Sequence, residues 1–173
     1  MFSIQPLLHD EFVILQPLET HDFEQLYAVA SDPLIWEQHP NKNRYQREVF
    51  QTFFDGAIAS KGAFLVLDAT SKEVIGSTRF YDIDPINDCI TIGYTFYARR
   101  CWGKGYNRAA KKLLTDYAFQ HVSKVLFFIG TNNIRSQIAI AKIGAEKIGE
   151  QEIAYYGEAA TTNFIFALER NIK

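Results

Sequence analysis

The sequence predicts a mixed α+β fold for its 173 residues. Two kinds of pattern support this fold class. Short runs rich in β-branched and aromatic residues, bounded by Gly, Pro, Asn or Asp, indicate strands. Longer segments with apolar residues three and four positions apart indicate helices. In chain order they give β-α-α-β-β-β-α-β-α-β-β, and the length suits one domain, residues 1–173, with a sizeable core.

The first predicted elements are a strand and two helices. The run Phe12–Leu18 predicts a strand, which Pro17 ends. Thr20 offers an N-cap to the first helix, and Pro33 stops that helix. Gln46–Ser60 predicts a second helix because its apolar residues fall on one side.

Three strands and a long helix follow. Ala63–Ala69 and Val74–Tyr81 predict a hairpin, because a Thr-Ser-Lys turn separates them. A second turn leads into a strand at Cys89–Tyr97. Apolar residues at helical spacing then predict a central helix at Arg108–Phe119.

The last elements are a strand, a helix and a final pair of strands. Val125–Ile129 is short and wholly apolar, a pattern typical of a strand buried on both faces. Asn133 begins the helix and Gly144 closes it. Ala145–Ala154 and Asn163–Glu169 predict the final strands.

Composition narrows the functional classes. Hydrophobic residues make up 47% and charged residues 22% of the chain, as in soluble globular proteins. The net charge of -2 argues against a general binder of nucleic acid or membrane surfaces. The cysteines, Cys89 and Cys101, are too few for a disulfide framework, so we expect a cytoplasmic setting. We also expect no signal peptide and no membrane span.

One stretch, Arg99–Arg108, has the features of an anion site. It lies between a predicted strand and a predicted helix, and it contains a Gly-x-Gly pair. Glycines let backbone N–H groups converge, and a helix N-terminus adds about half a positive charge. Arg99, Arg100 and Lys104 add full charges, so the stretch predicts a phosphate or pyrophosphate ligand. Arg108 stands where a dinucleotide fingerprint needs its third glycine, and the Gly-Lys-Ser/Thr of NTPases is absent.

The pattern Arg100-x-x-Gly103-x-Gly105, between a strand and a helix, resembles the acetyl-CoA pyrophosphate loop of the GNAT superfamily of N-acetyltransferases. The wider run from Ile92 to Tyr106 resembles the branch that acetylates the N-termini of ribosomal proteins. An ordinary strand–turn–helix with a Gly-rich turn is the simpler interpretation of this motif alone.

A second motif supports the resemblance. Asn133-Ile134-Arg135-Ser136 is followed by Lys142-Ile143-Gly144-Ala145, where that branch usually reads Lys-Leu-Gly-Phe. Two motifs in the right order are far more specific than either alone, and the resemblance extends from Phe12 to Glu169.

The resemblance implies a GNAT-like fold: a central mixed, mostly antiparallel sheet of about seven strands with helices on both faces. In that family the strand before the phosphate loop and the strand after the central helix splay apart, and the acetyl-pantetheine arm enters the gap. Here those strands would be Cys89–Tyr97 and 125–131.

The resemblance also implies acetyl-CoA as co-substrate, with pantetheine along the first of these strands and pyrophosphate at the loop. Some of the implied residues have simpler interpretations: Phe96 as a core residue, Arg100 as a solvated charge and Asn133 as an N-cap. The residues implied to bind acetyl-CoA are Tyr94, Thr95, Phe96, Tyr97, Arg100, Cys101, Trp102, Gly103, Lys104, Gly105, Tyr106, Asn107, Asn133 and Ser136.

Ser136 is the implied catalytic residue, as a proton donor to the leaving thiolate; otherwise it is a first-turn helix serine. The sequence departs from the family pattern at Ile140, where many relatives carry a Tyr general acid, and at Thr91, where the branch commonly has an acidic residue. No general base stands out. The candidates are Asp82, Asp84, Glu152, Glu158 and His39.

The acceptor side is expected at Trp36, Glu37 and His39, and at the last hairpin near Tyr155. A carboxylate beside an aromatic face is a sensible place for an amine cation, although Trp36 could equally be a core residue. No metal is expected, because His and Cys residues show no ligand spacing.

The predicted function is acetyl-CoA-dependent N-acetyltransfer to a primary amine, by direct attack in a ternary complex. The amine could be a protein N-terminus or a small molecule. The alternative is a non-catalytic CoA-binding or protein-interaction domain on the same fold. The expected partners are acetyl-CoA and an amine acceptor, with no nucleic acid and no membrane. The oligomeric state is left open, a homodimer included.

Overall fold

The computed structural model describes residues 3–170. The strands are β1 (Leu8–His9), β2 (Val13–Pro17), β3 (Ala63–Asp68), β4 (Val74–Asp84), β5 (Cys89–Tyr97), β6 (Lys124–Gly130), β7 (Glu146–Ala154) and β8 (Ala160–Glu169). The helices are α1 (Phe23–Ala30), α2 (Arg47–Ser60), α3 (Tyr106–Ala118) and α4 (Ile134–Ala141), with short 3-10 turns η1 (Thr20–Asp22), η2 (Pro33–Ile35) and η3 (Arg99–Cys101).

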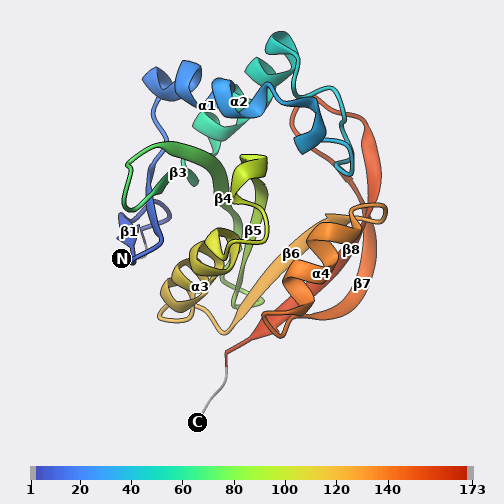
Figure 1. Cartoon of the computed structure of the whole chain (residues 1–173). Helices are drawn as coiled ribbons and strands as arrows, with labels where there is room; N and C mark the ends of the chain where they lie inside the picture. The colour runs from blue at the N-terminus through green and yellow to red at the C-terminus, as the bar shows by residue number, and fades with distance from the viewer. Residues whose placement is uncertain (1–2, 171–173) are drawn as a thin grey trace.

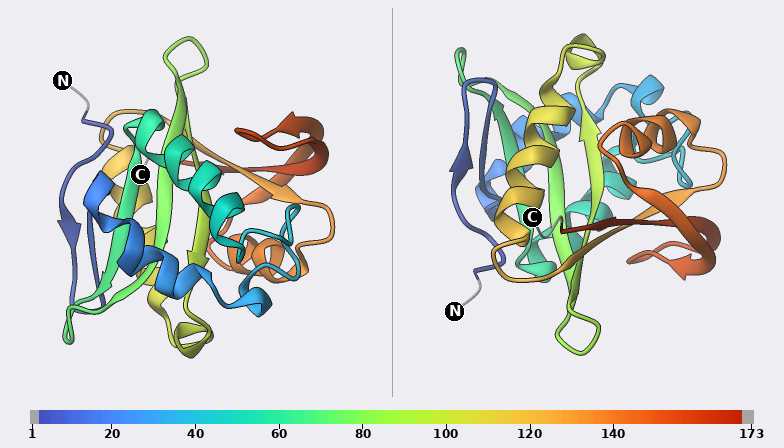
Figure 2. Two further views of the ribbon diagram at one scale, coloured as in Figure 1. Left: turned by 90° about the horizontal axis from the view of Figure 1, so that it is seen from above. Right: turned by 90° about the horizontal axis from the view of Figure 1, so that it is seen from below.

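All eight strands form one sheet, in the order β1-β2-β3-β4-β5-β6-β8-β7. Helices cover both faces: α1 and α2 lie over one, and α3 and α4 over the other (Figures 1 and 2). The apolar sides of the helices explain this layering, since α2 buries Phe50, Phe53 and Phe54, and α3 buries Leu114 and Ala118. No helix in residues 3–170 is long and apolar enough to cross a membrane.

The pairing of β5 with β6 is the feature that makes room for a site. It is the parallel pair of the sheet, and it joins only Cys89–Thr91 to Lys124–Leu126. Beyond these residues β6 continues alongside β8, while β5 continues alongside β4. The two strands therefore part towards the C-terminal end of each, as the resemblance implied (Figure 1).

A β-bulge in β5 shapes the parting. Ser77 pairs with Phe96 and Arg79 with Gly93, so one residue of β4 lies opposite two of β5, Tyr94 and Thr95. Tyr94 has φ 52°, a left-handed conformation that costs a non-glycine residue free energy. Its ring is held by the Arg79 guanidinium, 3.9 Å from the ring centroid.

The structure corrects several predicted elements. A further strand, β1, pairs with β2 and is too short to leave a periodic pattern in the sequence. The turn at Thr20 is a 3-10 turn, and the first α-helix begins only at Phe23. The strand β6 is not buried on both faces: Leu126 and Phe128 are only partly buried.

Candidate active site

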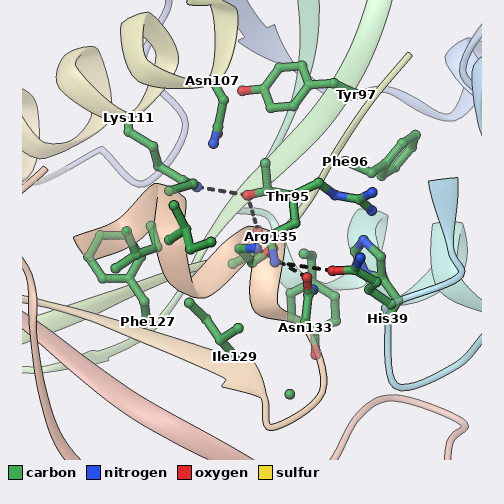
Figure 3. A pocket seen from close by; sticks show the side chains of 18 of the residues that line it. His39, Thr95, Phe96, Tyr97, Asn107, Lys111, Phe127, Ile129, Asn133 and Arg135 are labelled. Carbon is green, nitrogen blue, oxygen red and sulfur yellow. Dashed lines mark hydrogen bonds between the residues drawn. The ribbon is translucent and has the colours of Figure 1, made fainter. Parts of the chain in front are cut away.

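A cavity of about 890 Å³ occupies the space between β5 and β6 (Figure 3). Its lining begins at Gly103 and Gly105, in the loop between β5 and α3. It ends at an acceptor end, defined here by His39, Arg44 and Tyr155. Cavities of this size hold cofactor-sized ligands.

The glycine loop, Trp102–Gly105, offers an open anion cradle. Gly103 and Gly105 have φ 72° and 91°, which glycine adopts without strain. A Cβ on Gly103 would meet no atom within 4 Å, and one on Gly105 would meet only Phe12, at 3.9 Å. Within residues 3–170 their N–H groups have no backbone acceptor, whereas those of Cys101, Trp102 and Lys104 bond to carbonyls in the same turn. The two glycines and the first turn of α3 are thus the available donors.

The basic side chains near the loop are placed differently from the expectation. Arg100 points away from the cavity and forms an ion pair with Glu73 at 2.9 Å. Arg99 pairs with Asp32, and Lys104 does not line the cavity. Arg108, in the first turn of α3, does line it. Positive charge at this end of the cavity therefore comes from Arg108 and the helix N-terminus.

Two buried polar atoms beside the loop lack partners. The Tyr97 hydroxyl and the Asn107 Oδ1 are buried and make no hydrogen bond within the described residues. Both side chains line the cavity (Figure 3). Buried polar atoms nearly always have partners, so this pair fits a polar ligand such as the amide-bearing pantetheine arm. Tyr106, by contrast, donates to Asp68 outside the cavity and lowers the pKa of that carboxyl to about 2.

The second motif lies on the opposite wall. Asn133 lines the cavity, and its Oδ1 accepts from the Ser136 N–H at 3.2 Å, so it also caps α4. The Ser136 side chain lines the cavity too. Ile140, the position of the missing Tyr, is a buried core residue that reaches the cavity wall.

Lys111 is a cavity residue that was not predicted from the sequence. It is 4% exposed, lines the cavity, and donates to the Thr95 Oγ1 at 2.8 Å (Figure 3). Burial lowers its pKa from 10.5 to about 7. A signal was present: Lys111 stands three and seven residues before Leu114 and Ala118, on the buried stripe of α3.

At the acceptor end, the His39 ring packs against Trp36, with 5.0 Å between ring centroids. Burial and the charges of Arg44 and Arg135 lower the pKa of His39 to about 3, so the ring is neutral at physiological pH. Arg44 is buried and bonds Glu158 twice, at 2.8 and 2.7 Å.

The other two predicted acceptor residues do not line the cavity. Trp36 is completely buried, and its Nε1 donates to the Ala30 carbonyl at 2.7 Å, so it is a core residue. Glu37 is half exposed and lies 3.6 Å from Arg135. Of the three predicted residues, His39 alone faces the cavity.

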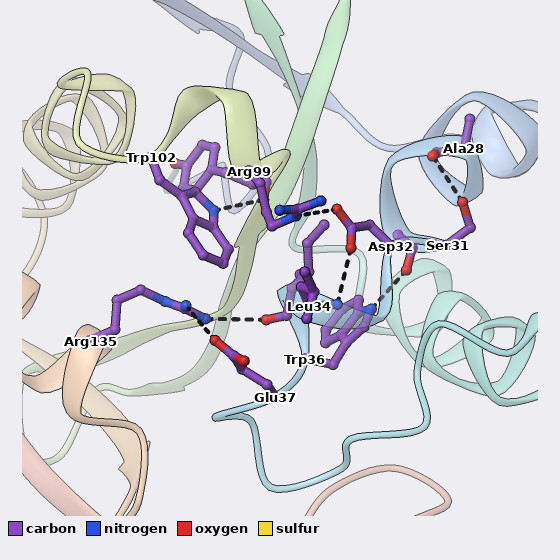
Figure 4. A network of polar contacts seen from close by, with 12 residues as sticks. Ala28, Ser31, Asp32, Leu34, Trp36, Glu37, Arg99, Trp102 and Arg135 are labelled. Carbon is purple, nitrogen blue, oxygen red and sulfur yellow. Dashed lines mark hydrogen bonds and ion pairs between the residues drawn. The ribbon is translucent and has the colours of Figure 1, made fainter.

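Arg135 connects three segments at the cavity mouth (Figure 4). Its guanidinium stacks on the Trp102 ring, 3.8 Å from the centroid, and donates to the Ile35 carbonyl at 3.3 Å. Its backbone N–H donates to the Gln38 side chain at 3.1 Å. The segment 33–40 is thereby fixed against α4.

Residues 13–146 match the family model described as "Acetyltransferase (GNAT) domain". The chain belongs to this GNAT acetyltransferase family. A related GNAT protein from Bacillus licheniformis, described as "Uncharacterized N-acetyltransferase p20", is 30% identical over 118 residues. That alignment covers 65% of each protein.

Solved structures of GNAT proteins share the fold. A GCN5-related N-acetyltransferase from Brucella melitensis superposes with a TM-score of 0.81 and 21% identity, over 95% of this chain and 79% of the other. Mycobacterium smegmatis RimJ in complex with CoA-disulfide superposes with a TM-score of 0.71 and 17% identity, over 95% of this chain and 86% of the RimJ chain. The mixed, mostly antiparallel sheet predicted from the resemblance is confirmed.

None of the five predicted general-base candidates of this GNAT domain is well suited to that role. Glu158 is held by Arg44, and His39 is too weak a base with its lowered pKa. Asp84 caps its own turn, and Asp82 and Glu152 are exposed outside the cavity.

Proposed function

We propose that this chain is an acetyl-CoA-dependent N-acetyltransferase that acts on a primary amine in a cytoplasmic setting. The observation that carries the proposal is the continuous cavity between β5 and β6. It joins an anion cradle at the glycine loop to the acceptor end at His39, Arg44 and Tyr155. A donor and an acceptor entering from the two ends would meet inside it.

The donor side rests on named groups of this chain. The N–H groups of Gly103 and Gly105, with Arg108, would receive the pyrophosphate. The Tyr97 hydroxyl and the Asn107 Oδ1 would receive polar groups of the pantetheine arm. When bound, acetyl-CoA supplies the thioester.

Direct attack by the amine is favoured over an acyl-cysteine intermediate. Cys101 lines the cavity, but burial raises the pKa of its thiol. Cys89 is buried outside the cavity lining, and burial raises its pKa too. A thiol nucleophile needs the thiolate form, which these surroundings oppose.

The charges near the acceptor end favour an amine with a single positive charge over a polyamine. Arg44 is neutralised by Glu158, and Arg135 by Glu37. The Arg79 guanidinium stacks on the Tyr94 ring. It has no carboxylate partner within residues 3–170. The local surplus is therefore positive, which repels a polycation.

The test is the release of CoA thiol from acetyl-CoA over an amine panel. The panel contains an N-terminal dipeptide, an amino acid amide and spermidine. We expect turnover with at least one of the first two and the least with spermidine. Binding of acetyl-CoA without turnover on any amine would instead support a non-catalytic CoA-binding domain.

A further inference from the structure

Lys111 places an ammonium group on the wall of the donor cavity without a carboxylate. Its Nζ donates to the Thr95 Oγ1 at 2.8 Å and to the Thr78 Oγ1 at 3.5 Å. No ion pair involves it within the described part of the chain. Lysines this deeply buried are normally paired with a negative charge, and here residues 3–170 supply none.

The elements around Lys111 contribute no charge. They present Thr78 from β4, Thr95 from β5 and the Phe127 ring from β6, 5.8 Å from the Nζ. Other titratable groups of the cavity wall include Tyr97 on β5, Cys101 in η3 and Arg108 on α3. Burial raises the pKa of Tyr97, so that phenol stays neutral, and burial is also the cause of the lowered pKa of Lys111. A counter-charge for the ammonium form would therefore be supplied by a ligand in the cavity.

Lys111 lies at the point where the strands part. Phe127 follows directly after Leu126, the last residue of β6 that pairs with β5. Along α3, Lys111 is six residues from Gly105, or roughly 9 Å along the helix axis. A donor anchored by phosphate at the glycine loop must extend its arm along this cavity.

We propose that Lys111 is the catalytic acid, which protonates the CoA thiolate released by acetyl transfer and holds it in the cavity. This inference rests on the proposed function. Ile140 offers no hydroxyl for that role. Ser136 does, but an alcohol is a far weaker acid than a thiol of pKa about 8.5, whereas an amine with a pKa near 7 can protonate a thiolate downhill.

The acceptor nitrogen bonds to the thioester carbonyl carbon, the carbon–sulfur bond breaks, and its electron pair stays on sulfur. The Lys111 ammonium gives its proton to the sulfur and becomes a neutral amine. The acceptor ammonium loses two protons on becoming an amide: one restores the Lys111 ammonium and the other goes to solvent.

The experiment compares CoA with desulfo-CoA, which lacks the thiol, in wild type, Lys111→Met and Lys112→Met. Met keeps the length of the side chain without the charge. Lys112 is the matched control, because it is 72% exposed and pairs with Asp116. Calorimetry gives the two affinities, and ultraviolet absorbance of the thiolate gives the pKa of the bound thiol.

In wild type and Lys112→Met we expect the pKa of the bound thiol to be lowered by about one unit, which leaves it above the pKa of Lys111. CoA should bind about tenfold more tightly than desulfo-CoA above that pKa. Both differences should disappear in Lys111→Met. An unshifted thiol pKa in wild type overturns the proposal, and this result does not depend on whether Lys111→Met folds. A lowered thiol pKa that persists in Lys111→Met overturns it too. Failure of wild type to bind acetyl-CoA would instead overturn the proposed function itself.

Discussion

Burial of the Lys111 amine should destabilise the protein when no ligand is bound, and the size of this effect should depend on pH. The pKa of Lys111 is depressed from 10.5 to about 7 in the folded chain. Between these two values the unfolded chain binds more protons, so stability rises with pH across that window. We expect Lys111→Met to be about 1–4 kcal/mol more stable than wild type near neutral pH. The advantage should shrink towards pH 10.

Urea denaturation at a series of pH values measures this difference. Lys112→Met should follow wild type throughout, because its ammonium is exposed. A Lys111→Met advantage of the same size at neutral pH and at pH 10 would contradict a titrating amine as its cause.

Individual side chains were the hardest features to predict from the sequence. The capping role of Asn133 is local, and it was one of the two roles predicted for this residue. The positions of the Lys111 and Arg100 side chains are set by residues distant in the sequence. Lys111 packs against strands β4 to β6, and Arg100 pairs with Glu73 in the preceding hairpin. Trp36 was ambiguous because indole suits both a core and a binding loop.

At the scale of elements, the glycine loop should be sensitive to a single methyl group. Gly105→Ala places a side chain at φ 91°, which costs about 1–2 kcal/mol, and fills part of the open cradle. We expect acetyl-CoA affinity to fall by roughly tenfold or more, equivalent to about 1.4 kcal/mol. Calorimetry on the folded variant measures it.

Gly144→Ala is the matched control. Gly144 has φ 93°, and its Cβ would lie 3.8 Å from Leu168, so the two substitutions impose similar strain. Gly144 ends the α4 region and does not line the cavity. Equal stability losses with equal affinity losses would show that strain, and not the cradle, explains the result.

The segment 33–40 should loosen when its anchor to α4 is removed. Arg135→Ala deletes the stack on Trp102 and the bond to the Ile35 carbonyl. We expect faster hydrogen exchange in residues 33–40 and a several-fold higher KM for the acceptor. Arg47→Ala removes a comparable arginine that pairs with Glu24 and contacts two rings, but outside the cavity lining. Unchanged exchange of the segment in Arg135→Ala would rule out an anchoring role.

Most elements were predictable because their signals are local. The strand before the glycine loop, the loop itself and α3 follow from apolar periodicity and two glycines. The strand β1 could not be predicted, because two residues carry no period and gain their structure from pairing with β2.

For the whole molecule, the short β5–β6 junction predicts two regions of unequal stability. Only three residue pairs join the β1–β5 part of the sheet to the β6–β8–β7 part. Without ligand, amides of β6 and β8 should therefore exchange at a lower opening free energy than those of β2 to β4. Acetyl-CoA should slow exchange in residues 94–97 and 127–130, because it would occupy the space between them.

Hydrogen exchange with and without acetyl-CoA tests this coupling. The amides of β2 and β3 act as the internal reference, since they already pair along their length. Uniform exchange across the sheet, or protection confined to the glycine loop, would contradict it.

The bulge at Tyr94 has a consequence for anyone who redesigns this protein. The Tyr94 ring lies among Arg79, Tyr81 and Tyr155, on the side where an acceptor would enter. Its left-handed backbone also belongs to the kink that bends β5 beside the donor channel. A smaller side chain introduced to admit a bulkier amine would also remove the contacts that hold this kink. A substitution of Tyr94 would therefore change the range of accepted amines and the fit of the cofactor together. Mutant libraries aimed at new acceptors should keep Tyr94 and vary the neighbours of its ring.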